Sequence, residues 1–394
     1  MSNSEQSPII AKGPFQGVLP RIAVRVALPL AACALVLGFG PVLASDRGQG
    51  QSIGDTSVFA RIPGPVGHPF GIAVDTDRVY VSTSRGDFFA QQTNSLGERV
   101  FAFDTDGELL QTTSIATTPN ATMGLWGVAL DGNPRRTHKL YVADMNGRVL
   151  RLDLSNKHAA PEVFATPPPP FNTGDWRTTM WNDLVFDREG NLIMTDDKPR
   201  LWRITPDGQA SVWFTDERLL GITGFAGGPL GGRIDPSGKF FYFSITISAP
   251  FPADALIYRL RISDHPTAAD LELVHRFPAV PGRIPPQASG IVFAQSGNLY
   301  VGLLGSNEIA VLDPSGTEIR RISNPLFDSP WGLAFMGNSL LVSNADIQQP
   351  ESPSKWIVSK VFVGEPGLAL NRPKTSADPE DDRLGGGLFD GLAN

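Results

Sequence analysis

Cysteine and histidine are scarce in this sequence. Its 394 residues include one cysteine, Cys33, and five histidines. A single cysteine cannot form an intramolecular disulfide, and no cysteine or histidine run has the spacing of a zinc site. The sequence also contains no phosphate-binding loop and no serine, histidine and aspartate pattern of a hydrolase triad. These absences exclude several common routes to catalysis.

Long amphipathic helical periods are missing too, and so is any excess of positive charge. The formal net charge is −7. Because an acidic surface repels nucleic-acid phosphates, we expect no nucleic-acid partner. Turn formers are abundant instead, with 41 glycines and 34 prolines. Many turns imply many short elements, which favours an all-β fold.

Residues 21–44 predict export. Arginines precede an apolar run, and Val42-Leu43-Ala44 places small residues where signal peptidase cleaves. We therefore expect a signal peptide at 1–44, a secreted or periplasmic protein and no stable membrane span after processing. An uncleaved anchor is the alternative, but Pro29 and Pro41 favour removal.

Cys33 falls inside this predicted signal peptide, so the mature chain would contain no cysteine. Leu30-Ala31-Ala32-Cys33 resembles a bacterial lipoprotein box. The apolar run continues past Cys33, however, where a lipoprotein normally turns polar. Lipidation is therefore the lesser alternative to a cleaved signal peptide.

Six segments of the sequence repeat one plan: a small residue, a short apolar stretch, a turn and an alternating strand. Their starts are 42 to 59 residues apart, a spacing typical of four-stranded propeller blades. The repeats start at Gly71, Gly127, Asp183, Gly231, Gly290 and Gly332. Since one blade cannot bury both of its faces, the repeats must stack around an axis. We predict a six-bladed β-propeller of antiparallel blades; a β-sandwich or two smaller barrels is the alternative.

The sixth repeat is incomplete. Residues 355–361 form its third strand, and no outer strand follows. Residues 57–62 form a strand that belongs to no repeat, so we expect them to close the ring as the missing outer strand. The predicted organisation is a linker at 45–56, a propeller at 57–370 and a disordered tail at 371–394. We expect a monomer.

The residue before each repeat start is predicted to lie at the upper end of an innermost strand and to face the axis. These residues are Phe70, Trp126, Asn182, Leu230, Ser289 and Trp331. Ligand pockets are concave and few, so this ring is the best place for a site. The ring aromatics with neighbouring Trp181, and Ser289, are candidate ligand-binding residues for a flat ligand or a sugar face. Equally, the aromatic side chains could plug the channel.

The turn-and-strand pattern, above all residues 181–196, resembles the senescence-marker-protein/gluconolactonase family and its strictosidine-synthase-like and paraoxonase-like relatives. The resemblance implies one divalent cation at the top of the axis, which polarises a lactone carbonyl and activates a water. Asn182 matches a metal-ligating asparagine of that family, and Asp183 resembles a neighbouring calcium ligand. Phe70, Leu230 and Ser289 depart from the expected ligands.

Two further residues are candidates for catalysis. His68 lies two residues before Phe70 and is placed like a general base, and Asp175 lies in the long loop before the third repeat. Both have a plainer interpretation as loop residues that bond the backbone. The same holds for the aspartates that follow second strands, which are Asp144, Asp196, Asp197 and Asp346.

Three functions remain open at this point. The first is hydrolysis of a lactone or ester by means of a divalent cation near Asn182, for which calcium is the candidate. The second is non-catalytic binding of a small apolar or sugar ligand by a propeller that has lost the family metal site. The third is an interaction scaffold, since one fold hosts many functions.

Overall fold

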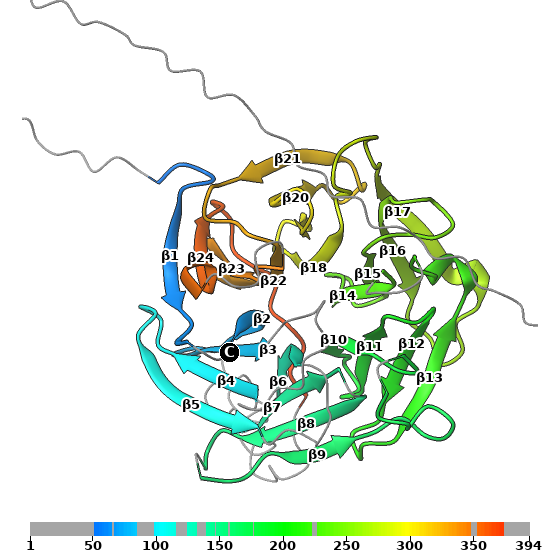
Figure 1. Cartoon of the computed structure of the whole chain (residues 1–394). Coiled ribbons are helices and arrows are strands. Elements are labelled where there is room, and N and C mark those ends of the chain that lie inside the picture. The colour runs from blue at the N-terminus through cyan, green and yellow to red at the C-terminus, as the bar shows by residue number, and fades with distance from the viewer. Residues whose placement is uncertain are drawn as a thin grey trace, which may run out of the picture. The chain divides into compact units, whose positions relative to one another are not determined.

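Twenty-four strands, grouped into six sheets of four, make up the part of the chain that the structure describes. The structure is a computed structural model (Figure 1). It describes residues 51–373 except 65–66, 85–97, 116–123, 132–138, 146, 157, 176, 223–226 and 348–352. Every sheet is antiparallel, and the only helices in this part are three short 3₁₀ turns. These are η1 (Glu217–Leu219), η2 (Ala268–Asp270) and η3 (Pro353–Lys355).

Each sheet is one blade, in which the strands follow one another from the axis outward. Blades one to three comprise, in that order, β2 (His68–Val74), β3 (Val79–Ser84), β4 (Glu98–Phe103) and β5 (Leu109–Ile115); β6 (Leu125–Leu130), β7 (Lys139–Asp144), β8 (Arg148–Asp153) and β9 (Glu162–Ala165); and β10 (Trp181–Phe186), β11 (Leu192–Asp196), β12 (Arg200–Ile204) and β13 (Ala210–Thr215). Blades four to six comprise β14 (Pro229–Ile234), β15 (Phe240–Ile245), β16 (Ala255–Arg261) and β17 (Leu271–Phe277); β18 (Ala288–Phe293), β19 (Leu299–Leu303), β20 (Glu308–Leu312) and β21 (Glu318–Ser323); and β22 (Pro330–Met336), β23 (Ser339–Asn344), β24 (Ile357–Phe362) and β1 (Thr56–Arg61). The predicted six-bladed β-propeller is confirmed.

The turn between the first two strands of blade three shows why the repeats fold as blades. Gly190 ends this turn at a φ of +87°, a conformation that costs glycine little. Asp187 opens the turn, and its Oδ1 accepts the backbone N–H of Asn191 at 2.8 Å. The Asn191 amide donates to Oδ2 of the same aspartate at 2.8 Å. The turn residues therefore fix the register of β10 on β11.

The ring is closed as predicted by a strand from before the first blade. β1 pairs antiparallel with β24, with Thr56 opposite Val361 and Arg61 opposite Ile357. The innermost strands contact one another in order around the axis, and β22 contacts β2. Blade six therefore combines both ends of the repeat region, and its β24 edge is covered.

Neighbouring blades are joined by a repeated side-chain hydrogen bond. In four blades a buried Ser or Thr on the second strand accepts a backbone N–H from its own innermost strand. The same hydroxyl donates to the carbonyl at the axial position of the next blade. The four residues are Ser82, Thr195, Ser244 and Ser343, and they donate to Trp126, Leu230, Ser289 and Phe70 respectively. The carbonyl groups of these four axial residues are thus each held by the preceding blade.

Beyond β24, the chain crosses the lower face of the ring, where the turns after the innermost strands lie (Figure 1). We call residues 366–373 the strap. Its Leu368 N–H donates to the Phe293 carbonyl at 2.9 Å, and Asn371 donates to the Phe186 carbonyl at 3.1 Å. Arg372 ends the crossing at blade one, where Nη1 pairs with Asp75 at 2.8 Å. The strap therefore links blades five, three and one.

Some predictions concern residues that the structure does not describe. The signal peptide at 1–44, with Cys33, and most of the tail at 371–394 lie outside the described residues. Within the described part of the chain, no helix has the length and apolar character needed to cross a membrane.

Candidate functional site

Large apolar side chains meet at the upper part of the axis. Phe70 lies 5.7 Å from Trp126, centroid to centroid, with the rings nearly parallel. The Trp331 ring contacts both edge to face, at 4.7 Å from Phe70 and 4.9 Å from Trp126. Phe70 and Trp126 are fully buried, and Trp331 is 7% exposed. We call this group, with the buried neighbours that pack against it, the axial cluster: Phe70, Trp126, Met145, Met180, Leu230, Leu304, Trp331 and Ala345.

The axial cluster fills the position at which the sequence places a ligand. The aromatic rings contact one another, as in the plugged channel of the alternative interpretation. Trp181 points into blade three, where it is fully buried and packs edge to face on Trp202 at 5.6 Å. The cavity beside the cluster has a volume of only about 20 Å³, which is the room that one water molecule needs.

Asn182 and Ser289, the polar members of the ring, both hydrogen-bond to the next blade. The Asn182 amide donates from Nδ2 to the Pro229 carbonyl at 2.8 Å. Ser289 donates from Oγ to the Pro330 carbonyl at 2.7 Å. The two contacts are equivalent, because each acceptor is the first residue of the next innermost strand. Of these two side chains, only Asn182 retains a polar atom without a partner among the described residues, its buried Oδ1.

Asp183 is held by blade four. Its Oδ2 pairs with Nη1 of Arg233 at 2.7 Å and accepts the Gly232 N–H at 3.1 Å. Its Oδ1 accepts the N–H of Leu184 at 2.9 Å. Both carboxylate oxygens are therefore engaged by protein donors, and the charge is balanced by a guanidinium.

These residues do not fit the divalent cation that the family resemblance implies. Calcium takes six to eight oxygen ligands. The ring offers one free side-chain oxygen, on Asn182, whereas the Asp183 oxygens accept protein hydrogen bonds. Nowhere in the described residues do three His, Cys, Asp or Glu side chains gather as a metal site would require. Apolar side chains occupy four of the six ring positions, and the Ser289 hydroxyl is hydrogen-bonded to the Pro330 carbonyl.

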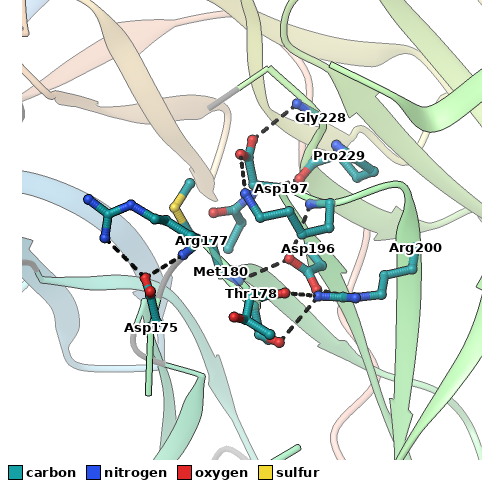
Figure 2. A network of polar contacts seen from close by, with 12 residues as sticks. Asp175, Arg177, Thr178, Met180, Asp196, Asp197, Arg200, Gly228 and Pro229 are labelled. Carbon is teal, nitrogen blue, oxygen red and sulfur yellow. Dashed lines mark hydrogen bonds and ion pairs between the residues drawn. The ribbon is translucent and has the colours of Figure 1, made fainter. Parts of the chain in front are cut away.

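Asp196, the last residue of β11, and the adjacent Asp197 belong to a separate polar network (Figure 2). Asp196 is fully buried, and its Oδ2 pairs with Arg200 at 2.6 Å and accepts Nε1–H of Trp202 at 2.8 Å. Asp197 accepts the Gly228 N–H at 3.1 Å, and its Oδ2 lies 3.5 Å from Nζ of Lys198. Burial raises the pKa of both carboxyls, that of Asp197 to about 6. This network anchors the loop before blade four to blade three.

The two candidate catalytic residues have different neighbours. His68 is buried, with Nδ1 at 2.6 Å from the Ala345 carbonyl and its ring 5.2 Å from that of Trp356. Asp175 is partly exposed and accepts the backbone N–H of Arg177 at 2.9 Å (Figure 2). None of these contacts joins His68 to Asp175.

A larger opening lies on the lower face, away from the predicted ring of axial residues. It has a volume of about 660 Å³, and we call it the lower cleft. The lower ends of β2, β18 and β22 line it on one side and the strap on the other, and Arg233 of β14 also lines it. No sequence pattern indicates this cleft. The strap has no repeat period, and nothing in the sequence distinguishes Arg233 from the other arginines within strands.

The fold and the plugged axis define an all-β propeller. Its described residues do not assemble a metal centre at the top of the axis, where the family resemblance implies one. Residues 127–343 match the model of the SMP-30/Gluconolactonase/LRE-like region, and the chain belongs to this family. A comparison with curated protein sequences gives no match.

Solved structures share the fold. Regucalcin from Agrobacterium tumefaciens, described as a calcium-binding protein, superposes with a TM-score of 0.57 at 15% identity, covering 80% of this chain and 98% of its own. A luciferin-regenerating enzyme gives 0.53 at 15% identity, covering 79% and 97%. A protein of unknown function from Bacteroides thetaiotaomicron gives 0.53 at 16% identity, covering 78% and 72%.

Proposed function

We propose that this chain is a ligand-binding member of the gluconolactonase family in which apolar side chains have replaced the axial metal centre. The observation that carries the proposal is the contact between Phe70, Trp126 and Trp331 at the ring positions. Phenyl and indole side chains supply no oxygen ligand, and their mutual packing leaves room for about one water. A small organic molecule is the ligand class that this family and fold suit best.

Metal-dependent hydrolysis of a lactone or ester is the second candidate. One observation favours it, the buried Oδ1 of Asn182 that has no hydrogen-bond partner among the described residues. An amide oxygen is an acceptable calcium ligand. The remaining ring positions do not complete a ligand set, so they support no catalytic step at the axis.

The test measures metal content and lactone turnover of the purified protein and of two matched variants. Asn182→Ala and Ser289→Ala each remove one hydrogen bond to the carbonyl that opens the next blade. Only Asn182→Ala also removes the unpartnered oxygen. We expect substoichiometric metal, melting that is insensitive to calcium and to chelator, and no turnover of a lactone panel in any of the three proteins.

The opposite result is equally clear. A stoichiometric divalent cation together with lactone turnover, both lost in Asn182→Ala and retained in Ser289→Ala, would establish the second candidate. A calcium-dependent gluconolactonase serves as the positive control for the assay.

We also propose that the protein acts after export. The basis is the Val42-Leu43-Ala44 junction that follows the apolar run. Mass spectrometry of protein from the native host should find an N-terminus near Ser45. Recovery of an intact, soluble chain containing residues 1–40 would contradict the proposal.

A further inference from the structure

The lower cleft has the dimensions and the lining of a small-molecule site. Its volume of about 660 Å³ lies within the range of ligand pockets, roughly 300–1,000 Å³. Most of its lining is aliphatic or aromatic, from β2, β18, β22 and the strap. It lies on the face opposite the axial cluster, because the strap contacts the turns that end the innermost strands.

Apolar side chains of the cleft remain in contact with solvent. Leu370 on the strap is 46% exposed. Val74, Phe335 and Leu368 are only partly buried at the edges of the hydrophobic core. Exposed apolar groups that converge on one concave surface are typical of a site for an apolar molecule.

Arg233, on β14, lines this cleft beside the apolar residues. Its side chain is 9% exposed, and both of its side-chain hydrogen bonds leave from Nη1, to Asp183 at 2.7 Å and to the Gly232 carbonyl at 2.6 Å. The Nε–H is buried and has no partner in the described part of the chain. A guanidinium N–H binds a carboxylate through a charge-assisted hydrogen bond. With Nη1 engaged by Asp183 and Nε enclosed by protein, Nη2 is the donor that remains for a ligand.

The cations at the cleft are matched by two aspartates. Asp183 faces Arg233, and Asp75 pairs with Arg372 at 2.8 Å. The cleft therefore carries no excess charge that would attract a polyanion. One carboxylate, hydrogen-bonded by Nη2 of Arg233 and followed by an apolar chain, matches this combination of one remaining donor group and an aliphatic wall.

We propose that the lower cleft binds an amphiphilic monocarboxylate, with the carboxylate on Nη2 of Arg233. The apolar chain lies between Phe335 and the strap residues Leu368 and Leu370. The inference deepens the proposed function by naming a site and a ligand class. The site does not require a metal, and it uses no residue of the axial cluster.

The test is calorimetric titration of the full chain with octanoate, decanoate and dodecanoate below their micelle concentrations. We expect one molecule bound per chain and affinity rising up to about fourfold per added methylene, as burial of each CH₂ predicts. Decanol and methyl decanoate, which have no carboxylate, should bind about tenfold more weakly.

Three variants locate the site. Arg233→Lys keeps a cation beside Asp183 but loses the Nη2 donor, and it should weaken decanoate about tenfold. Leu370→Ser should weaken decanoate severalfold without affecting folding, because the side chain is already 46% exposed. Leu220→Ser, at a leucine that is 42% exposed outside the cleft, is the matched control and should bind as the parent protein does.

Equal binding of decanol and decanoate, equal binding by Arg233→Lys or Leu370→Ser and the parent, or no saturable binding would each overturn the inference. None of these results would restore an axial metal centre. Conversely, a metal lost in Asn182→Ala would overturn the proposed function and leave a carboxylate site in the lower cleft intact. The two proposals therefore fail separately.

Discussion

Ser343, on the second strand of the last blade, donates a hydrogen bond from Oγ to the carbonyl oxygen of Phe70, at the start of the first blade. The same hydroxyl accepts the N–H of Gly332 at 2.7 Å. The Ser343 side chain therefore joins blade six to blade one, and it supports ring closure together with the pairing of β1 and β24.

Removal of this hydroxyl should destabilise the ring. Ser343→Ala leaves a buried N–H and a buried carbonyl without their partner, so the free energy of unfolding should fall by about 1–3 kcal/mol. Ser359→Ala is the matched control, because Ser359 is equally buried in the neighbouring strand but its Oγ has no partner among the described residues. Urea unfolding should separate the two variants; equal loss in both would show that the Ser343 bond contributes nothing.

Asp197 should make stability depend on pH. Burial raises its pKa from 3.8 to about 6 in the folded protein. Between these values the folded protein keeps a proton that the unfolded chain releases. The free energy of unfolding therefore falls as pH rises through this window, by on the order of 3 kcal/mol. Asp197→Asn should flatten this decline in urea unfolding measured at several pH values.

The pKa of Asp153 is shifted in the opposite direction, and this residue serves as the control. Hydrogen bonds from Lys139 and Ser155 hold its pKa well below the usual range. Its contribution to the free energy of unfolding is thus present above the pKa of the unfolded chain and is lost as the solution becomes more acidic. Asp153→Asn should leave the decline between pH 4 and pH 6 in place; a decline unchanged in Asp197→Asn would contradict the assignment to Asp197.

The axial cluster should behave as hydrophobic core. Trp126→Ala removes a fully buried indole that contacts two aromatic rings, and should cost about 3–5 kcal/mol of unfolding free energy. Calcium should not restore the loss, which thermal unfolding with and without calcium will measure. The exposed Leu220→Ala should have little effect, and a Trp126→Ala protein as stable as its parent would show that the cluster is not packed as described.

Arg372 should hold the strap in place. Its guanidinium pairs with Asp75 and donates from Nη2 to the Val74 carbonyl at 2.8 Å. In Arg372→Ala the strap should open more often, so limited proteolysis should cut within residues 364–373 several times faster. Arg283→Ala, at an exposed loop arginine, should be cut as the parent is. Unchanged cleavage sites and rates in Arg372→Ala would contradict the anchoring role.

The blades could be predicted from sequence because their determinants are local. Adjacent residues determine both the turn from Asp187 to Gly190 and the alternation of β11, and the blades repeat this plan. Closure by β1 was predictable because an incomplete sixth repeat and an unassigned first strand are complementary.

The content of the axis was less predictable. The sequence places six residues on one ring, but whether their side chains meet or leave a pocket depends on the spacing of the innermost strands. That spacing brings the ring centroids of Phe70 and Trp331 to 4.7 Å from each other, so that the two rings are in contact. The pairing of Asp183 with Arg233 was missed for a similar reason, since a contact between different blades leaves no periodic signal in the chain.

The placement of β1 in the last blade has a consequence for synthesis and for engineering. β1, the first strand in the described part of the chain, has no strand partner until residues 357–361 have been made, so its pairing must wait for the synthesis of almost the whole repeat region. A circular permutant opened between Arg61 and His68, with β1 joined after residue 373, would make every blade contiguous. Such a chain could complete each sheet in the order of its translation.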